Sequence, residues 1–187
     1  MNVQPLLDQY GYLALLVGTF FEGETAILLA SSLIPQQIFS FPLTILFAFS
    51  GSFLSDWLYY FIGRINGKVF IAKRPKLLHL MQSINEVFDR YQIQILLSYR
   101  FLYGFRVVIP VMIGMSGFKP KAYLFYTIVS GLLWATVVTS IGYLIGSTLK
   151  LSLKDIEENI IFVALGFSSF GLLLSLTVRY FLGKQIK

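Results

Sequence analysis

The sequence predicts an all-α integral membrane protein, and its charge content and hydropathy are the first grounds for that prediction. Only 13% of the 187 residues are charged and 56% are hydrophobic, whereas soluble proteins are about 25% charged. The mean hydropathy is +0.73. So little polar surface cannot cover a globule in water. The composition therefore argues against a soluble enzyme or a soluble nucleic-acid-binding domain, and it predicts one membrane domain over residues 1–187.

Long uncharged runs are the third ground for the prediction, and they locate the spanning helices. Residues 25–55, 122–149 and 159–178 contain no Lys, Arg, Asp or Glu. Each run is long enough to supply the roughly 20 apolar residues that a transmembrane helix needs. The expected transmembrane helices cover about residues 41–63, 122–147 and 160–181.

Two further apolar regions, residues 10–35 and 93–118, carry charges near their centres. Each apolar half is too short to cross a bilayer, and stretches of this length favour re-entrant segments. We therefore predict two re-entrant helical hairpins, which need protein or a water-filled cavity around their broken backbone. The expected break positions are Gly23, Gly104 and Pro110.

The two halves of the chain resemble each other weakly at an offset of 79 residues, since Gly63 and Gly67 then match Gly142 and Gly146. Each half would hold one re-entrant hairpin and one transmembrane helix, which is an odd number of crossings. The second half must then be inverted relative to the first, as in many transporters. The predicted fold is two inverted repeats with an extra C-terminal transmembrane helix.

Basic residues predict the orientation of the chain. The connection over residues 64–92 carries six of them and has the apolar spacing of an amphipathic helix on the membrane surface. By the positive-inside rule this connection and the basic C-terminus are cytoplasmic. The connection also holds the one histidine, His79, which we interpret as an interfacial residue rather than a catalytic base.

Catalytic and metal-binding patterns are missing from the sequence. It has no cysteine, no HExxH, no P-loop and no GxSxG motif. The basic residues lie in short segments between apolar runs, which suits loops at an anionic membrane better than a nucleic-acid partner. We expect no enzyme activity, no catalytic residue, no metal and no cofactor.

Five ionisable residues fall at membrane depth in this scheme. Each costs from about 2.5 to more than about 10 kcal/mol when it is neither paired nor hydrated, so they should face the protein interior. The five are three acids and two bases, Glu22, Glu24, Asp56, Arg100 and Arg106.

The spacing of these charges suggests roles for them. Arg100 and Arg106 converge best around an unwound turn, where paired guanidinium groups suit a phosphate or carboxylate. Glu22 and Glu24 can face one cavity, where two carboxylates resist joint ionisation and so offer a route to proton coupling. Alternatively, the arginines only neutralise the acids, with no role in ligand binding. Asp56 is either a further functional acid or the cap of a neighbouring helix break.

These residues also carry a family resemblance over about residues 10–150. The chain resembles the DedA family of membrane proteins, in the VTT or SNARE-associated superfamily, and within it the shorter bacterial branch. The family's acids map onto Glu22 and Glu24 and its two arginines onto Arg100 and Arg106, although here a single Gly23 replaces a longer segment between the acids. The matching motifs are Phe20 to Thr25, Gly51 to Asp56, Tyr59 to Arg64, Arg100 and Phe101, Gly104, Arg106, Pro110, Gly114, Gly131, Trp134, Gly142, Tyr143 and Gly146.

The resemblance implies a multi-pass protein of the bacterial cytoplasmic membrane that translocates lipids. Its expected substrate is undecaprenyl phosphate, returned across the membrane in dependence on the proton motive force. The expected partners are an anionic lipid phosphate and protons. The sequence is also compatible with a homo-oligomer. The alternatives are a proton-coupled exchanger of small cations or drugs that uses the acids, and an uncoupled phospholipid scramblase.

Overall fold

A computed structural model describes residues 4–72, 91–101 and 106–149, together with Ser169. Within these ranges every regular element is a helix, which agrees with the predicted all-α class. The chain divides into two compact units, Met1–Phe53 with Gly131–Lys187, and Leu54–Ser130. We call them unit 1 and unit 2. The two longest helices, α3 (Phe41–Ala72) and α6 (Pro120–Leu149), each supply residues to both units.

Both long helices are apolar enough to cross a membrane. The candidate spans are Phe41–Ile65 in α3 and Pro120–Thr148 in α6, which overlap the transmembrane helices predicted over 41–63 and 122–147. Helix α3 continues to Ala72, past the predicted end of its span. The third predicted span, 160–181, and most of the predicted connection over 64–92, His79 included, lie outside the described residues.

Large apolar side chains remain exposed along both long helices. A soluble monomer rarely exposes so extended an apolar surface, because water makes it unfavourable. Hydrocarbon around the two spans removes that penalty. Exposed examples on α3 and α6 are Leu46, Leu54, Leu58, Phe125, Leu133 and Leu144.

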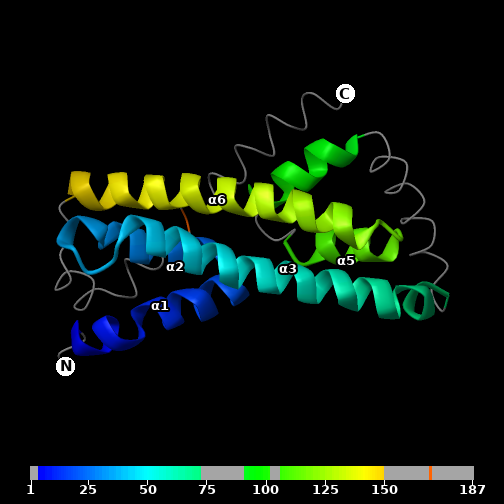
Figure 1. The fold of residues 1–187 in the computed structure, drawn as a ribbon, viewed down its shortest axis with the longest axis horizontal. Coiled ribbons are helices and arrows are strands. Elements are labelled where there is room, and N and C mark those ends of the chain that lie inside the picture. The colour runs from blue at the N-terminus through cyan, green and yellow to red at the C-terminus, as the bar shows by residue number, and fades with distance from the viewer. Residues whose placement is uncertain (1–3, 73–90, 102–105, 150–168, 170–187) are drawn as a thin grey trace. The chain divides into compact units, whose positions relative to one another are not determined.

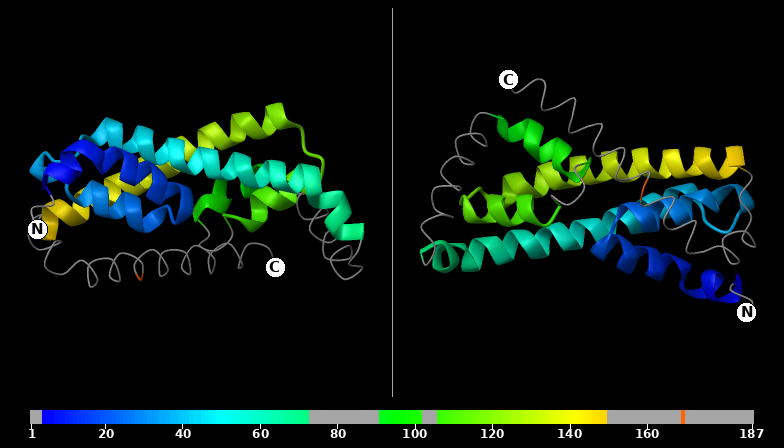
Figure 2. Two further views of the ribbon diagram at one scale, coloured as in Figure 1. Left: turned by 90° about the horizontal axis from the view of Figure 1, so that it is seen from below. Right: turned by 180° about the vertical axis from the view of Figure 1, so that it is seen from behind.

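In unit 1, two helices form a hairpin, coloured blue in Figures 1 and 2. Helix α1 (Gln4–Phe21) ends at a two-residue turn, and α2 (Glu24–Ser32) runs back beside it. Gly23 holds the turn with φ 48°, a backbone angle that residues with a Cβ rarely adopt. The 3-10 helix η1 (Ile34–Gln36) then leads toward α3.

In unit 2, a second break separates helical residues 91–98 from α5 (Val108–Met115). The 3-10 helix η2 (Tyr99–Phe101) directly follows the first of these segments. Both segments pack with α3 and α6 around a buried apolar core. The core consists of Tyr60, Leu96, Ile113 and Tyr123, with Trp57, Ile95, Ile109, Phe118 and Tyr126 packed against it.

Glycine allows close helix contact in both units. In unit 1, a Cβ added to Gly146 of α6 would overlap the backbone carbonyl of Ser32 at the end of α2. In unit 2, a Cβ on Gly63 of α3 would overlap the backbone carbonyl of Val111 in α5. Small residues at such contacts let helix backbones approach closely, as is common in membranes. In each unit the helix that follows the break, α2 or α5, thus packs against the C-terminal half of a long helix, α6 or α3.

Candidate functional site

The candidate site is a buried charge cluster in unit 2, and its acid is Asp56. This residue lies in α3, inside the candidate span Phe41–Ile65, and its side chain is almost completely buried. An ionised carboxylate in such a place needs a partner, because neither lipid nor an apolar core can solvate it.

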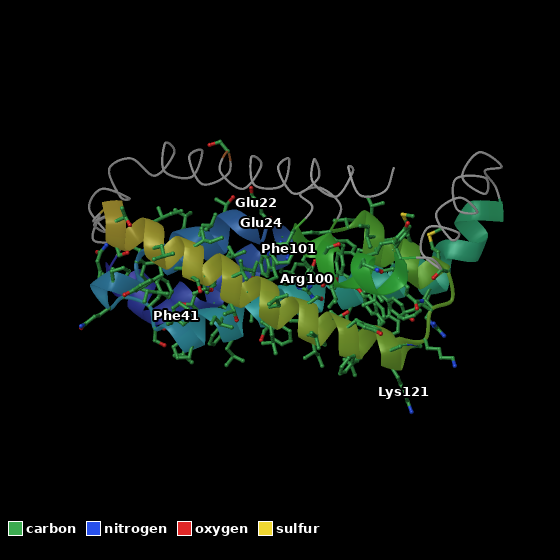
Figure 3. The ribbon with its side chains drawn as sticks, turned by 90° about the horizontal axis from the view of Figure 1, so that it is seen from above. Glu22, Glu24, Phe41, Arg100, Phe101 and Lys121 are labelled. Atoms are coloured by element: carbon green, nitrogen blue, oxygen red, sulfur yellow. The ribbon has the colours of Figure 1, made fainter. Side chains whose placement is uncertain are left out.

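Arg100, in η2, supplies that partner. Its Nη2 atom forms a salt bridge with Asp56 Oδ2, and the arginine side chain is 0% exposed. The same nitrogen donates to the backbone carbonyl of Thr127 in α6 at 3.3 Å. Figure 3 labels Arg100 next to Phe101, where the helix over 91–98 has given way to the break. The pair therefore ties the break to a spanning helix.

Two tyrosines complete the cluster. Tyr99 is fully buried, and its hydroxyl donates to Asp56 Oδ2 at 2.7 Å, the carboxylate oxygen that also meets Arg100. Tyr123, in α6, donates from its hydroxyl to the backbone carbonyl of Asp56 at 3.4 Å. Sequence reasoning missed both tyrosines and Thr127. The one available signal was the position of Tyr99 directly before a membrane-depth arginine.

Arg106 belongs to the same charge cluster. It is half-buried in the turn that precedes α5, and its charge interacts electrostatically with the Asp56 carboxylate. Two guanidinium groups thus act on one carboxylate within unit 2. Guanidinium groups gathered in this way are suited to attract an anion.

Tyr60 and Arg64 of α3 contact the residues beside the cluster. The Tyr60 ring stacks on the ring of Tyr123 with 4.4 Å between centroids and 13° between planes. The hydroxyl of Tyr60 donates to the carbonyl of Phe118 at 2.6 Å. Arg64 Nη1 donates to the same carbonyl at 3.0 Å. These contacts fix the start of α6, and with it Tyr123, against α3.

The two predicted glutamates lie in unit 1, whereas the cluster belongs to unit 2. Glu22 is exposed in the turn after α1, and its Oε1 accepts a 3.3 Å hydrogen bond from Thr25. Glu24 is half-buried in the first turn of α2. The shared cavity predicted for the acids and arginines stays a prediction.

The expected break residues differ in their placement. Gly23 lies in the turn between α1 and α2. Pro110 is buried in the first turn of α5. Backbone N–H groups in the first turn have no partner within the helix, so a proline, which lacks the N–H, is tolerated there. Gly104 lies outside the described residues.

The cluster has no charged counterpart at the matching positions of the other half. Gly63 and Gly142 are 79 positions apart, and at that offset Asp56 corresponds to Ala135 and Arg100 to Phe21. Ala135 is fully buried in unit 1. The weak internal repeat therefore does not extend to the charges of the candidate site.

The described residues contain no group of three or more His, Cys, Asp or Glu side chains that could hold a metal ion. Instead the site offers guanidinium groups, a carboxylate and phenol hydroxyls at membrane depth. Such a set binds and exchanges anions by ion pairing and hydrogen bonding.

Comparison with known proteins places every residue of this cluster inside one family domain. The VTT domain model matches residues 9–144. The chain belongs to the DedA family. The match includes the glutamates of unit 1 and all of the described residues of unit 2.

Related DedA proteins are inner membrane proteins. The chain is 32% identical over 160 residues to the inner membrane protein YohD of Escherichia coli, covering 86% of this chain and 83% of YohD. It is 39% identical to YghB of Salmonella typhimurium, covering 69% of this chain and 60% of YghB. It is 30% identical to YqjA of Escherichia coli, covering 72% of this chain and 62% of YqjA.

The chain thus spans less than two thirds of YghB and YqjA. No solved structure matches it. Its apolar helices and its inner-membrane relatives make this DedA chain a membrane protein.

Proposed function

We propose that this DedA protein translocates an anionic lipid phosphate across the bacterial cytoplasmic membrane. One observation carries the proposal, namely the buried pair between Asp56 of a candidate spanning helix and Arg100 of η2, with Arg106 acting on the same carboxylate. Charges at such depth are expensive and usually mark a substrate or ion pathway. The family resemblance supplies the substrate, which we take to be undecaprenyl phosphate.

A phosphate headgroup suits the chemistry of this site. Guanidinium groups bind phosphate through short, parallel, charge-assisted hydrogen bonds. A headgroup would be held by the guanidinium groups of Arg100 and Arg106, while its isoprenoid tail stays in lipid. A cation would instead meet two guanidinium groups around one carboxylate, which disfavours its binding here.

We further propose that the fold consists of two inverted repeats, each a re-entrant hairpin and a spanning helix. Two observations support this arrangement. A helix, a break and a second helix occur at residues 4–32 and again at 91–115. The matched glycines Gly63 and Gly142 both lie at close helix contacts, with Val111 of α5 and with Ser31 of α2. An extra C-terminal spanning helix would leave the C-terminus cytoplasmic.

Coupling to protons forms the last part of the proposed function. Glu22 and Glu24, whose carboxylates would resist joint ionisation in one cavity, would take up and release the proton that couples transport to the proton motive force. The protein then needs no enzymatic step, because the ligand crosses the membrane without a change of covalent bonds.

Substitution of Arg106 tests the proposal most cleanly, because Arg106→Ala leaves the Asp56–Arg100 pair intact. In proteoliposomes that contain undecaprenyl phosphate, we expect this variant to move the lipid at least about tenfold more slowly, as expected when a charge-assisted hydrogen bond to the headgroup is lost. The matched control is Lys121→Ala, which removes an exposed cation in the first turn of α6 (Figure 3) and should retain the wild-type rate.

Undiminished transport of the lipid by Arg106→Ala would overturn the proposal. The same liposomes separate the alternatives. A flux of cations or drugs that depends on pH and on the acids more than on the arginines would indicate an exchanger. Equilibration of phospholipids between leaflets without any gradient would indicate a scramblase.

A further inference from the structure

The buried pair closes the candidate site to any ligand. Arg100 is 0% exposed and its Nη2 already contacts Asp56 Oδ2 and the carbonyl of Thr127. A headgroup can reach this guanidinium only in another conformation, in which the headgroup takes the place of the carboxylate. Asp56 is therefore a competitor for the same nitrogen atoms.

Tyr99 occupies a particular position in this competition. Its hydroxyl donates to the carboxylate oxygen that Arg100 contacts. When Arg100 turns to a headgroup, Asp56 loses its ion-pair partner while it is still buried, and an unsatisfied buried charge is costly. The Tyr99 hydroxyl remains on that oxygen and satisfies part of its hydrogen-bonding capacity. It thus lowers the cost of releasing the arginine.

We propose that Asp56 is the internal anion that competes with the lipid phosphate for Arg100, and that Tyr99 is a positioning residue that holds Asp56 once Arg100 has left it. This inference rests on the proposed function. It adds that the affinity for the headgroup is set by a carboxylate and a phenol that never touch the lipid.

The two residues should then have opposite effects on binding. Asp56→Asn removes the competing charge while it keeps the shape of the side chain, so the Kd for undecaprenyl phosphate should fall by about tenfold. Tyr99→Phe removes only the hydroxyl that holds Asp56, so the Kd should rise by about tenfold. Each factor corresponds to one hydrogen bond to a charged group.

The double variant tests whether the effect of Tyr99 on the Kd depends on the charge of Asp56. With asparagine at position 56 no charge is left for Tyr99 to hold, so adding Tyr99→Phe should change the Kd by less than about twofold. A merely structural role for Tyr99 would instead lower thermal stability and leave the Kd unchanged. The matched control is Tyr126→Phe, which removes a phenol hydroxyl from a residue packed against the same core and should not change the Kd.

Binding is measured on the full-length protein in detergent by native mass spectrometry, with undecaprenyl phosphate titrated against phosphatidylethanolamine. If the wild type does not bind the lipid phosphate, or if Arg106→Ala binds it equally well, the proposed function and this inference both fall. If binding needs Arg106 but Asp56→Asn weakens it or leaves it unchanged, only the competition is overturned. Should Asp56→Asn fail to fold, Tyr99→Phe keeps every charge, and a Kd equal to that of the wild type overturns the proposal.

Discussion

Replacement of Arg100 by methionine is expected to destabilise the protein by about 3–5 kcal/mol. The substitution keeps much of the side-chain volume, yet it leaves the Asp56 carboxylate buried without its salt bridge. Asp56→Leu should have a cost of similar size, because it leaves the guanidinium group without this carboxylate. The free energy of unfolding of each single variant, measured in detergent against a denaturant, checks these values.

The combined variant Asp56→Leu, Tyr99→Phe and Arg100→Met should recover most of that stability. It removes the acceptor together with the hydroxyl and guanidinium donors that meet it, and apolar replacement of a whole buried polar group is often neutral or stabilising. Under the proposed function, transport of undecaprenyl phosphate by this variant should nevertheless be lost, because one of the two guanidinium groups proposed to bind the headgroup is gone.

This separation of stability from transport decides between the two interpretations of the charges that the sequence leaves open. A stable triple variant with normal transport would mean that the ion pair only holds the fold together. A stable triple variant without transport supports a role in binding the headgroup.

Replacement of Gly63 or Gly146 by alanine is expected to destabilise the protein by on the order of 3 kcal/mol. In each case the new Cβ would overlap a backbone carbonyl, of Val111 or of Ser32, and a backbone cannot move aside as a side chain can. The gain in helix propensity from glycine to alanine, about 1 kcal/mol, offsets only part of this cost. Thermal unfolding in detergent measures the effect.

The matched control is Gly11→Ala, whose Cβ would meet the far edge of the Phe39 ring at 2.9 Å. The Cζ atom is the far end of a side chain that can swing aside about χ1, so the net change should stay within about 1 kcal/mol. Equal stability of all three variants would contradict the close helix contacts seen at Gly63 and Gly146.

Two of the three predicted spanning helices, and the position of Asp56 within one of them, were predictable from the sequence. Uncharged runs report directly on the length of a helix that can lie in hydrocarbon, and the candidate spans in α3 and α6 follow from them. The interruption of the first helical region could also be predicted, since Gly23 stands between two charges where an apolar segment should continue. Both the spans and this interruption follow from the residues within each segment and need no knowledge of tertiary contacts.

The partners of each charge could not be predicted. The sequence offers three acids and two bases at membrane depth, and Arg100 could pair with any of the three acids. Its pairing with Asp56 depends on how η2 packs against α3, which is a tertiary property. Tyr123 and Thr127 give no local signal either, because tyrosine and threonine in an apolar helix equally suit a membrane interface or ordinary packing.

The lack of charged residues at the positions matching Asp56 and Arg100 has a consequence for stoichiometry. A protein built from two repeats could bind one ligand in each repeat. Here Ala135 and Phe21, at the positions that match Asp56 and Arg100, cannot hold a phosphate by ion pairing. Among the described residues, the chain then offers a single ion-paired site for an anion, built from Asp56 of the first repeat and Arg100 of the second. Under the proposed function, each transport cycle would therefore move one lipid molecule.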